Sequence, residues 1–356
     1  MSPAFPQPAF WAGKSVFVTG HTGFKGGWLS LWLQQLGARV HGYSLEPPTQ
    51  PNLFTVANVE RGMASSTIAD IEDAGSLDAA MRSAQPDVVF HLAAQPLVRL
   101  SYAEPVATFA TNVMGTVNLF EAVRKCGSVK TIVNVTSDKC YENREWVWPY
   151  REDEAMGGFD PYSSSKACSE IVTAAYRRSF LATDNVGCSS ARAGNVIGGG
   201  DWAADRLLPD FFRALDAGMP LVIRSPNAVR PWQHVLEPLS GYLLLAERLT
   251  DEPRQFAEGW NFGPADSDAR PVSWIVERLT AARVGASWQL DSEPQLHEAN
   301  HLKLDSSKAR TRLSWRPRWQ LETALSMTGD WHDAWRNGED MHAVTLAQIA
   351  VYLESA

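Results

Sequence analysis

The sequence predicts an α/β protein: a doubly wound parallel sheet of the Rossmann type, with a smaller C-terminal substrate-binding lobe. Strand-like and helix-like segments alternate regularly through the first half of the chain, and the first strand runs into a glycine-rich turn. Beyond residue 200 the alternation becomes less regular. We therefore expect a larger domain from residues 1–195, rejoined by residues 236–262, and a smaller domain from residues 196–235 and 263–356.

The first strand and helix meet in a turn with three regularly spaced glycines. A β-branched and aromatic run, Ser15–Thr19, is followed by Gly20, Gly23 and Gly26 and then by an apolar run with helical spacing. Glycine lets backbone N–H groups approach a ligand, and the helix N-terminus offers partial positive charge to a pyrophosphate. The turn therefore predicts a dinucleotide site. It is not a nucleoside triphosphate P-loop, because no Gly-Lys-Ser/Thr follows at the required spacing.

The regular part of the chain supplies the rest of the predicted sheet. We expect strands at 39–45, 63–68, 87–92, 131–136 and 186–192, and helices at 74–84, 105–126 and 160–180. A polar cluster, Ser137-Asp138-Lys139-Cys140-Tyr141, follows the strand at 131–136. Open α/β sheets place their chemistry at the carboxyl ends of strands, so this cluster is a candidate site.

The second half predicts mainly helices. They fall at 208–217, 236–249, 272–284, 306–313 and 321–335, with extended segments at 221–223 and 260–263. We expect these segments to form the smaller lobe, except that residues 236–262 return to the main sheet.

Charge and composition exclude several classes of partner. The 356-residue chain has 45% apolar residues, a net charge of -8 and a pI near 5.5. Nucleic acid and anionic membranes require clustered positive charge, so neither is expected as the main partner. The sequence shows no secretory signal and no membrane-spanning run, and its four cysteines form no CxxC pair. We expect buried free thiols and a cytoplasmic location.

Tyr162 and Lys166 form the clearest candidate catalytic pair. Their spacing of four places them on one face of the helix that follows the polar cluster. An ammonium beside a phenol lowers the pKa of the phenol and can also hold ribose hydroxyls. Tyr162 is therefore a candidate base at a carbinol next to a nicotinamide.

The chain resembles the extended short-chain dehydrogenase/reductase superfamily in five motifs: Gly20-x-x-Gly23-Phe24-x-Gly26, Asp70-Ile71, Thr136-Ser137-Asp138-Lys139-Cys140-Tyr141, Tyr162-x-x-x-Lys166 and Arg192-Ala-Gly-Asn195. Within it, the segments GHTGFKGGWL, VTSDKCYEN, AGNVIGGGDWA and LKLDSSKA resemble the nucleotide-sugar 4,6-dehydratases, in particular those that act on CDP-glucose. The resemblance covers nearly the whole chain, from Lys14 to Trp335.

The resemblance implies an NAD-dependent lyase that converts CDP-D-glucose to the 4-keto-6-deoxy sugar, in deoxysugar synthesis for surface polysaccharide. It also implies a homodimer paired through helices 105–126 and 162–180. By resemblance, Asp138 is the acid at the C6 oxygen, Lys139 the base at C5 and Ser137 a hydrogen-bond partner of O4. The related dTDP-glucose enzymes have glutamate where this chain has Lys139. A lysine serves as base only if its pKa is lowered, by desolvation or a neighbouring cation.

Further ligand-binding residues are carried over from the same resemblance. The expected cofactor-binding residues are Gly20, Thr22, Gly23, Phe24, Gly26, Ser44, Asp70, Ile71, Ala93, Gln95, Asn112, Tyr162 and Lys166. The expected substrate-binding residues are Asn195, Arg206 and Arg230, since an arginine fork suits paired phosphate oxygens. Ser44 leaves the choice between NAD and NADP open, although no arginine stands beside it to bind a 2′-phosphate.

Three alternatives remain in view. A nucleotide-sugar 4-epimerase shares the fold and the Tyr162/Lys166 pair but needs no acid and base at C6 and C5. A catalytically silent NAD-binding protein would share the fold alone. The string His297-Glu298-Ala299-Asn300-His301 fits the H-E-x-x-H pattern of zinc proteases, but Pro294 and the extended-looking residues 302–304 leave little room for the helix that this pattern requires, so we expect no metal.

Overall fold

Seven parallel strands form the central sheet of the computed structural model, which describes residues 4–291 and 301–355. Their order is β3-β2-β1-β4-β5-β6-β11. The strands are β1 (Ser15–Thr19), β2 (Arg39–Ser44), β3 (Ser65–Ile68), β4 (Val88–His91), β5 (Thr131–Val135), β6 (Gly187–Ala193) and β11 (Gly259–Phe262). Every pairing in this sheet is parallel. The predicted doubly wound parallel sheet is confirmed.

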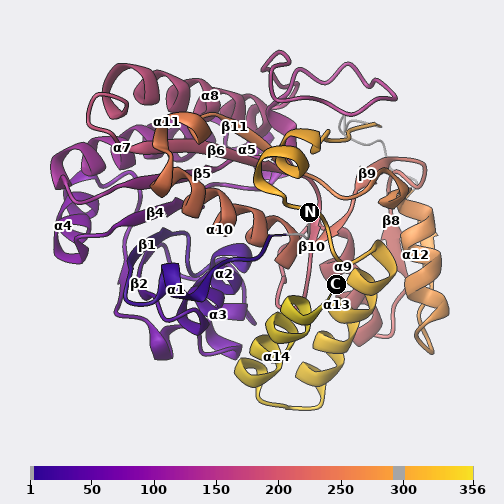
Figure 1. The fold of residues 1–356 in the computed structure, drawn as a ribbon. Coiled ribbons are helices and arrows are strands. Elements are labelled where there is room, and N and C mark those ends of the chain that lie inside the picture. Colours follow the sequence, from indigo (N-terminus) through magenta and orange to yellow (C-terminus); the bar gives the residue numbers. More distant parts are fainter. Residues whose placement is uncertain (1–3, 292–300, 356) are drawn as a thin grey trace.

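Helices cover both faces of the sheet (Figure 1). One face carries α4 (Ala74–Ala84), α7 (Gly115–Cys126) and α8 (Pro161–Tyr176), and the other carries α2 (Phe24–Gln35) and α10 (Leu236–Asp251), with α14 (Met341–Glu354) packed on α2. Because the sheet is buried on both faces, its central strands are mostly apolar rather than alternating; β1, β4 and β5 are buried at every position.

The smaller lobe lies beyond the carboxyl ends of the central strands, on the right of Figure 1. Its helices are α9 (Leu207–Asp216), α12 (Val272–Ala281) and α13 (Leu321–Arg336). Three short strand pairs accompany them: β7 (Val196–Ile197) with β10 (Gln233–His234), β8 (Leu221–Ile223) with β13 (Trp288–Leu290), and β9 (Val229–Pro231) with β12 (Ala269–Pro271). A separate apolar core, which includes Phe211, Trp232 and Ile275, holds the lobe together.

Short elements complete the described chain. The α-helices are α1 (Pro8–Trp11), α3 (Leu53–Val56), α5 (Val98–Ala103), α6 (Pro105–Phe109) and α11 (Pro253–Phe256). The 3₁₀ turns are η1 (Val59–Gly62), η3 (Asp138–Cys140) and η5 (Asp266–Asp268), and the π turns are η2 (Ala110–Met114), η4 (Arg177–Leu181) and η6 (Ala309–Leu313).

Three predicted helices contain a π turn, and several helices were not predicted, of which α14 is the longest. The helices expected at 105–126, 160–180 and 306–313 contain the π turns η2, η4 and η6. Helix α14 was missed because its apolar residues occur on all sides rather than in one stripe. It packs on α2, and Tyr352 donates a hydrogen bond to Glu237 of α10 at 2.8 Å. The C-terminal segment therefore shares the core under the main sheet.

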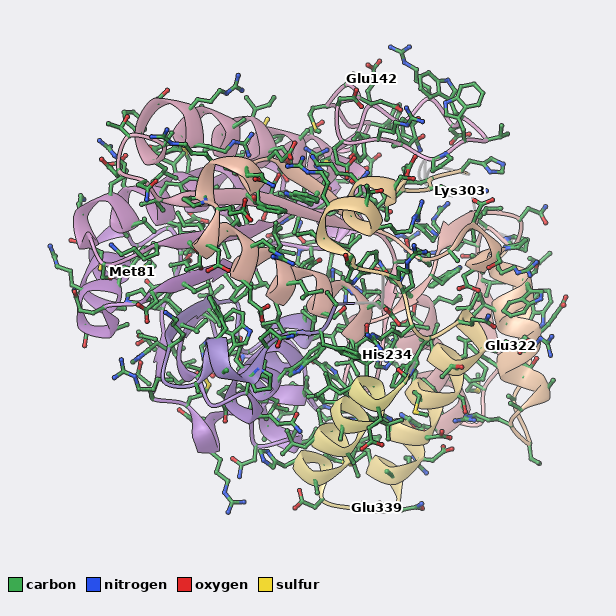
Figure 2. The ribbon with its side chains drawn as sticks, viewed as in Figure 1. Met81, Glu142, His234, Lys303, Glu322 and Glu339 are labelled. Carbon is green, nitrogen blue, oxygen red and sulfur yellow. The ribbon has the colours of Figure 1, made fainter. Side chains whose placement is uncertain are left out.

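The interior is filled by side chains, as Figure 2 shows. His234 lies among packed side chains, whereas Glu142 and Glu339 lie at the periphery. The edges of the Trp28 and Trp319 rings pack against the His234 ring. Burial lowers the pKa of His234 to about 3, so the imidazole is neutral and acts as a packing group.

Several other expectations concern ions, thiols and membranes. All four cysteines are free, but only Cys140 and Cys188 are buried as expected, whereas Cys126 and Cys168 are half-buried. In the part of the chain that the structure describes, no helix combines the length and apolar character that a membrane span needs. Residues 4–291 and 301–355 contain no group of three metal-liganding side chains. The H-E-x-x-H string lies outside the described residues except for His301, whose backbone oxygen accepts a hydrogen bond from Asn143 at 3.0 Å.

Candidate active site

A cavity of about 570 Å³ opens at the carboxyl ends of the central strands, between the sheet and the smaller lobe. Most of the predicted site residues line it: Gly20, Thr22, Gly23, Phe24, Gly26, Ser44, Asp70, Ile71, Ala93, Ser137, Asp138, Lys139, Tyr162, Lys166, Asn195, Arg206 and Arg230. These residues come from both halves of the sheet and from the lobe. Parallel strands end at one edge, so the fold brings them together.

The glycine turn forms a tight cradle at the start of α2. A Cβ on Gly26 would lie 2.0 Å from the backbone oxygen of Gly20, and Gly20 itself has a φ of +78°. Any side chain at these two positions would therefore open the turn. Among the residues that the structure describes, no side chain caps the N-terminus of α2, which begins after Gly23. The free N–H groups and the helix dipole face the cavity and fit the pyrophosphate of a dinucleotide.

The far end of the cradle is polar. Thr22 Oγ1 lies 2.8 Å from Ser44 Oγ and donates to the backbone oxygen of Leu45 at 2.8 Å. Asp70 Oδ1 accepts a hydrogen bond from the backbone of Glu72 at 2.9 Å, which fixes the carboxylate at the wall of the cavity. These hydroxyl and carboxylate groups suit ribose and adenine.

Gln95 and Asn112 do not line the cavity. Asn112 is 2% exposed, and its amide bonds to the backbone of Gln95 in both directions, at 2.8 and 3.1 Å. The Gln95 side chain donates to Thr108 Oγ1 at 2.9 Å. Asn112 also donates to Ser165 in α8 at 2.8 Å. Both amides are thus occupied in bracing the loop after β4 against α8, behind the cavity wall.

The strand-end triplet turns into the cavity after β5. Ser137 caps the 3₁₀ turn η3 by accepting from the backbone of Lys139, and its hydroxyl donates to Asp138 Oδ1 at 3.1 Å. Asp138 is 3% exposed, and its Oδ2 has no hydrogen-bond partner among the described residues. Burial raises the pKa of Asp138, although Lys139, a hydrogen bond from Ser137, Arg230 and Lys25 oppose the shift. A buried carboxyl with a raised pKa and an unpaired oxygen is suited to donate a proton.

The pKa of Tyr162 differs from the sequence-based expectation. We expected Lys166 to lower it, but burial raises it to about 12, with a hydrogen bond from Ser137 as the main opposing effect. The Lys166 ammonium instead donates a hydrogen bond from Nζ to the backbone oxygen of Val135 at 3.3 Å. Burial lowers the pKa of Lys166 itself to about 8, against the opposing charge of Glu170.

The three predicted substrate residues also line the cavity. Arg206 pairs with Asp201 of the GGGDW segment at 2.8 Å. Arg230 is 8% exposed, and its positive charge favours the ionised form of Asp138. The backbone oxygen of Asn195 accepts from Gln233, which joins β7 to β10 beside the cavity. Two guanidinium groups over one end of the cavity suit a diphosphate.

Lys25 is a cavity residue that the sequence reasoning missed. It occupies the first turn of α2, directly after Gly23 and Phe24. Burial lowers its pKa to about 8, with smaller effects from Arg206 and Asp138. A lysine near a helix N-terminus opposes the helix dipole, so its presence inside the glycine motif was the available signal for an anionic ligand.

The sequence matches a known protein family over most of its length. Residues 17–328 match the family described as GDP-mannose 4,6 dehydratase. The chain belongs to this family. Its relatives include the CDP-glucose 4,6-dehydratase of Salmonella typhimurium strain LT2, 54% identical over 97% of this chain and 98% of that protein. The dTDP-L-rhamnose 4-epimerase of Burkholderia thailandensis is 25% identical over 90% of this chain and 95% of that protein.

The fold of the 4,6-dehydratases is also found among solved structures. The dTDP-glucose 4,6-dehydratase from Bacillus anthracis, solved in complex with NAD, matches with a TM-score of 0.73 and 21% identity, over 89% of this chain and 96% of that chain. The resemblance to nucleotide-sugar 4,6-dehydratases that the motifs predicted is confirmed by the family match and the Salmonella relative.

Proposed function

We propose that this protein is an NAD-dependent CDP-D-glucose 4,6-dehydratase, which converts CDP-D-glucose to CDP-4-dehydro-6-deoxy-D-glucose and water. The near full-length 54% identity to the Salmonella enzyme supports the choice of sugar nucleotide. The single observation that carries the reaction is one cavity holding Asp138, Lys139 and Tyr162. An elimination across C5 and C6 needs an acid and a base in addition to the group that acts at O4.

Each side chain has a distinct part in the proposed reaction. Tyr162, beside Ser137, would take the proton from the C4 hydroxyl as the phenolate, which the positive charge of a bound nicotinamide ring would favour over the neutral phenol. Lys139 takes the C5 proton, which oxidation at C4 has made acidic. Asp138, whose pKa burial raises, protonates the departing C6 oxygen through its unpaired Oδ2. When bound, the cofactor supplies reversible hydride transfer between C4 and C6 of the sugar.

We assign the ligands to the two sides of the cavity. NAD lies along the glycine cradle, with its ribose and adenine near Thr22, Ser44 and Asp70. The CDP diphosphate lies near Arg206 and Arg230. This matches a division into a cofactor-binding domain of residues 1–195 with 236–262 and a nucleotide-sugar domain of residues 196–235 and 263–356.

We further propose a homodimer paired through α6–α7 and α8. These helices pack side by side, and they expose Val106, Met114 and Ile171 by 82, 53 and 59%. Apolar side chains gathered on adjacent helices suit a helical dimer contact. We place the enzyme in the cytoplasm, where its four free cysteines would stay reduced, and in the synthesis of a deoxysugar for surface polysaccharide such as O-antigen.

Product analysis by NMR tests the proposed function. The protein is incubated with NAD and, in parallel, with CDP-, dTDP-, UDP- and GDP-linked hexoses. We expect a 4-keto-6-deoxy product from CDP-glucose alone. An epimerised sugar would instead identify a 4-epimerase and remove Asp138 and Lys139 from the chemistry. No change with any donor, despite NAD binding, would identify a catalytically silent protein.

A further inference from the structure

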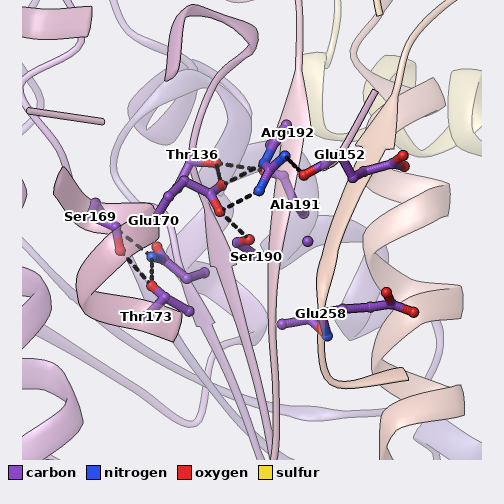
Figure 3. Close-up of polar contacts among 12 residues, drawn as sticks. Thr136, Glu152, Ser169, Glu170, Thr173, Ser190, Ala191, Arg192 and Glu258 are labelled. Atoms are coloured by element: carbon purple, nitrogen blue, oxygen red, sulfur yellow. Dashed lines mark hydrogen bonds and ion pairs between the residues drawn. The ribbon is translucent and has the colours of Figure 1, made fainter. Parts of the chain in front are cut away.

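A buried ion pair lies beside Thr136, the residue before the strand-end triplet (Figure 3). Glu170 in α8 and Arg192 in β6 are each 5% exposed. Arg192 Nε donates to Glu170 Oε1 at 3.0 Å, and Nη2 donates to Oε2 at 2.8 Å. Two parallel charge-assisted bonds hold the guanidinium and the carboxylate in a fixed relative orientation. The pair therefore locks α8 to β6.

Glu170 also reaches the residue before the triplet. Thr136 Oγ1 donates to Glu170 Oε1, and Ser190 Oγ donates to Oε2, each at 2.5 Å. Thr136 immediately precedes Ser137 at the end of β5. The carboxylate thus ties the entry of the triplet to the helix that carries Tyr162 and Lys166.

Arg192 reaches the residue after the triplet. Its Nη1 donates to the Tyr141 hydroxyl at 2.7 Å and to the backbone oxygen of Glu152 at 3.0 Å. Tyr141 in turn donates to Asn261 in β11 at 2.7 Å. The ion pair therefore holds both ends of the Ser137-Asp138-Lys139-Cys140 turn.

The Glu170 carboxylate also favours the charged form of Lys166, which lies one helical turn before it. Burial lowers the pKa of Lys166 to about 8, and Glu170 is the first of the groups that oppose this shift; Cys140 is the other. Burial raises the pKa of the Cys140 thiol well above its usual value, so that thiol carries no charge. Glu170 itself is buried, but Arg192 and its hydrogen bonds outweigh burial and lower its pKa, so it stays ionised.

Two further groups face Lys166 from other elements. Burial lowers the pKa of His91 in β4 to about 3, so its ring is neutral and supplies no counter-charge. Lys25 in α2 is the second group, and the positive charge of Lys166 is one of the effects that lower the pKa of Lys25. Glu170 is therefore the anion that keeps Lys166 protonated.

Buried ion pairs do not stabilise a fold as a rule, because desolvation of the two charges offsets their attraction. The contacts of this pair end instead on the neighbours of the catalytic groups. We propose that Glu170 and Arg192 are positioning residues for the proposed reaction: they hold the Ser137-Asp138-Lys139 triplet against the face of α8 that carries Tyr162 and Lys166. The inference takes its substrate from the proposed function. The measurement of NADH affinity does not depend on that function.

The decisive variant is Glu170→Gln, which keeps the shape of the side chain and removes its charge. We expect turnover of CDP-glucose to fall by about 10- to 100-fold, because the reacting groups lose their alignment. The alkaline limb of the rate profile should move by about one pH unit to lower pH, because Lys166 now loses its proton earlier. NADH affinity, measured by fluorescence, should weaken over the same lower pH range.

Glu247→Gln is the matched control. Glu247 is also a buried carboxylate, 8% exposed, and it accepts a hydrogen bond from Trp11 Nε1 at 2.7 Å on the opposite face of the sheet. Its rate profile and NADH affinity should match those of the wild type. An equal shift in this variant would mean that the loss of any buried carboxylate moves the profile, and it would overturn the proposal.

Arg192 variants separate position from charge. In Arg192→Lys, Glu170 stays ionised while the paired bonds are lost, so turnover should fall with the alkaline limb unmoved. The double variant Glu170→Gln/Arg192→Met removes both charges, so no unpaired charge stays buried to cause misfolding. Its alkaline limb should lie at the same lower pH as in Glu170→Gln. The proposal would be overturned if both Glu170 variants kept the alkaline limb at the wild-type pH and their turnover stayed within about twofold of the wild type. If the wild type left CDP-glucose unchanged, the proposed function would fail while the NADH titration still decided the role of Glu170.

Discussion

Burial sets the protonation of the groups at the end of β5. Asp138 has charged neighbours of opposite sign, yet the low exposure of its carboxyl dominates and raises its pKa. Tyr162 follows the same rule, since burial outweighs the hydrogen bond from Ser137. A sequence motif names these residues but does not report how deeply the fold buries them. The direction of each pKa therefore required the folded chain.

Lys139→Met tests the base at C5. The variant should bind NADH as the wild type does, because Lys139 lies at the strand end and not in the glycine cradle. Formation of the 4-keto-6-deoxy product should fall by about 10²- to 10⁴-fold, the usual contribution of a general base. The measurement is NMR product formation from CDP-glucose together with NADH fluorescence.

Lys130→Met provides the control for this variant. Lys130 is exposed just before β5, at the opposite edge of the sheet, and its loss should change neither quantity. Unchanged turnover in Lys139→Met would remove Lys139 from the mechanism.

Lys25→Met tests the lysine inside the glycine motif. Its ammonium lines the cavity at the first turn of α2, so we expect it to contact a phosphate or the nicotinamide end of the cofactor. NADH affinity should fall by about tenfold, equivalent to about 1.4 kcal/mol, and should become less sensitive to salt. Fluorescence titration at two salt concentrations measures both effects, with Lys130→Met again as control. Wild-type affinity and salt dependence would show that Lys25 does not contact the cofactor.

At the scale of elements, the glycine turn joins β1 to α2 with no spare space. Gly26→Ala places a Cβ 2.0 Å from the Gly20 oxygen, so the turn must open and its N–H groups must move away from the pyrophosphate. We expect NADH affinity to fall by more than about 100-fold and the free energy of unfolding to fall by about 1–3 kcal/mol. Titration and denaturant unfolding measure the two effects.

Gly75→Ala is the matched control for the turn. Gly75 lies in the first turn of α4, where a Cβ would meet only Asp73 Oδ1 at an ordinary 3.4 Å. Alanine favours helix more than glycine does, so stability should stay the same or rise slightly while NADH affinity is unchanged. Tight NADH binding by Gly26→Ala would show that the close approach of the turn is not needed for the cofactor.

At the scale of the whole molecule, the exposed apolar face of α6–α7 and α8 predicts the dimer. Val106→Arg/Ile171→Arg places two charges on this face, and charges buried without partners are costly. We expect the protein to become monomeric in sedimentation analysis at micromolar concentration. Val284→Arg is the control, because Val284 is fully exposed beyond α12 in the smaller lobe. A monomeric wild type, or a dimer that survives the double substitution, would contradict the proposed contact.

The sheet and its glycine turn were predictable because their signals are local. Continuous apolar runs mark strands that are buried on both faces, and the return of residues 259–262 beside β6 followed from one further run. The triplet was found because it directly follows a predicted strand, and the Tyr162/Lys166 pair because it lies on one face of a predicted helix. Helix α14 was not predicted, because its apolar residues lie on all sides of the helix and form no single apolar stripe.

The assembled cavity could not be read from the sequence, because its parts lie far apart along the chain. Arg206 and Asp138 come from different lobes, and only the parallel alignment of strand ends brings them to one cavity. The tie between Glu170, Arg192 and Thr136 joins three separate elements through side chains. Local propensity and periodicity describe neighbours in sequence, whereas burial, charge coupling and positioning depend on neighbours in space.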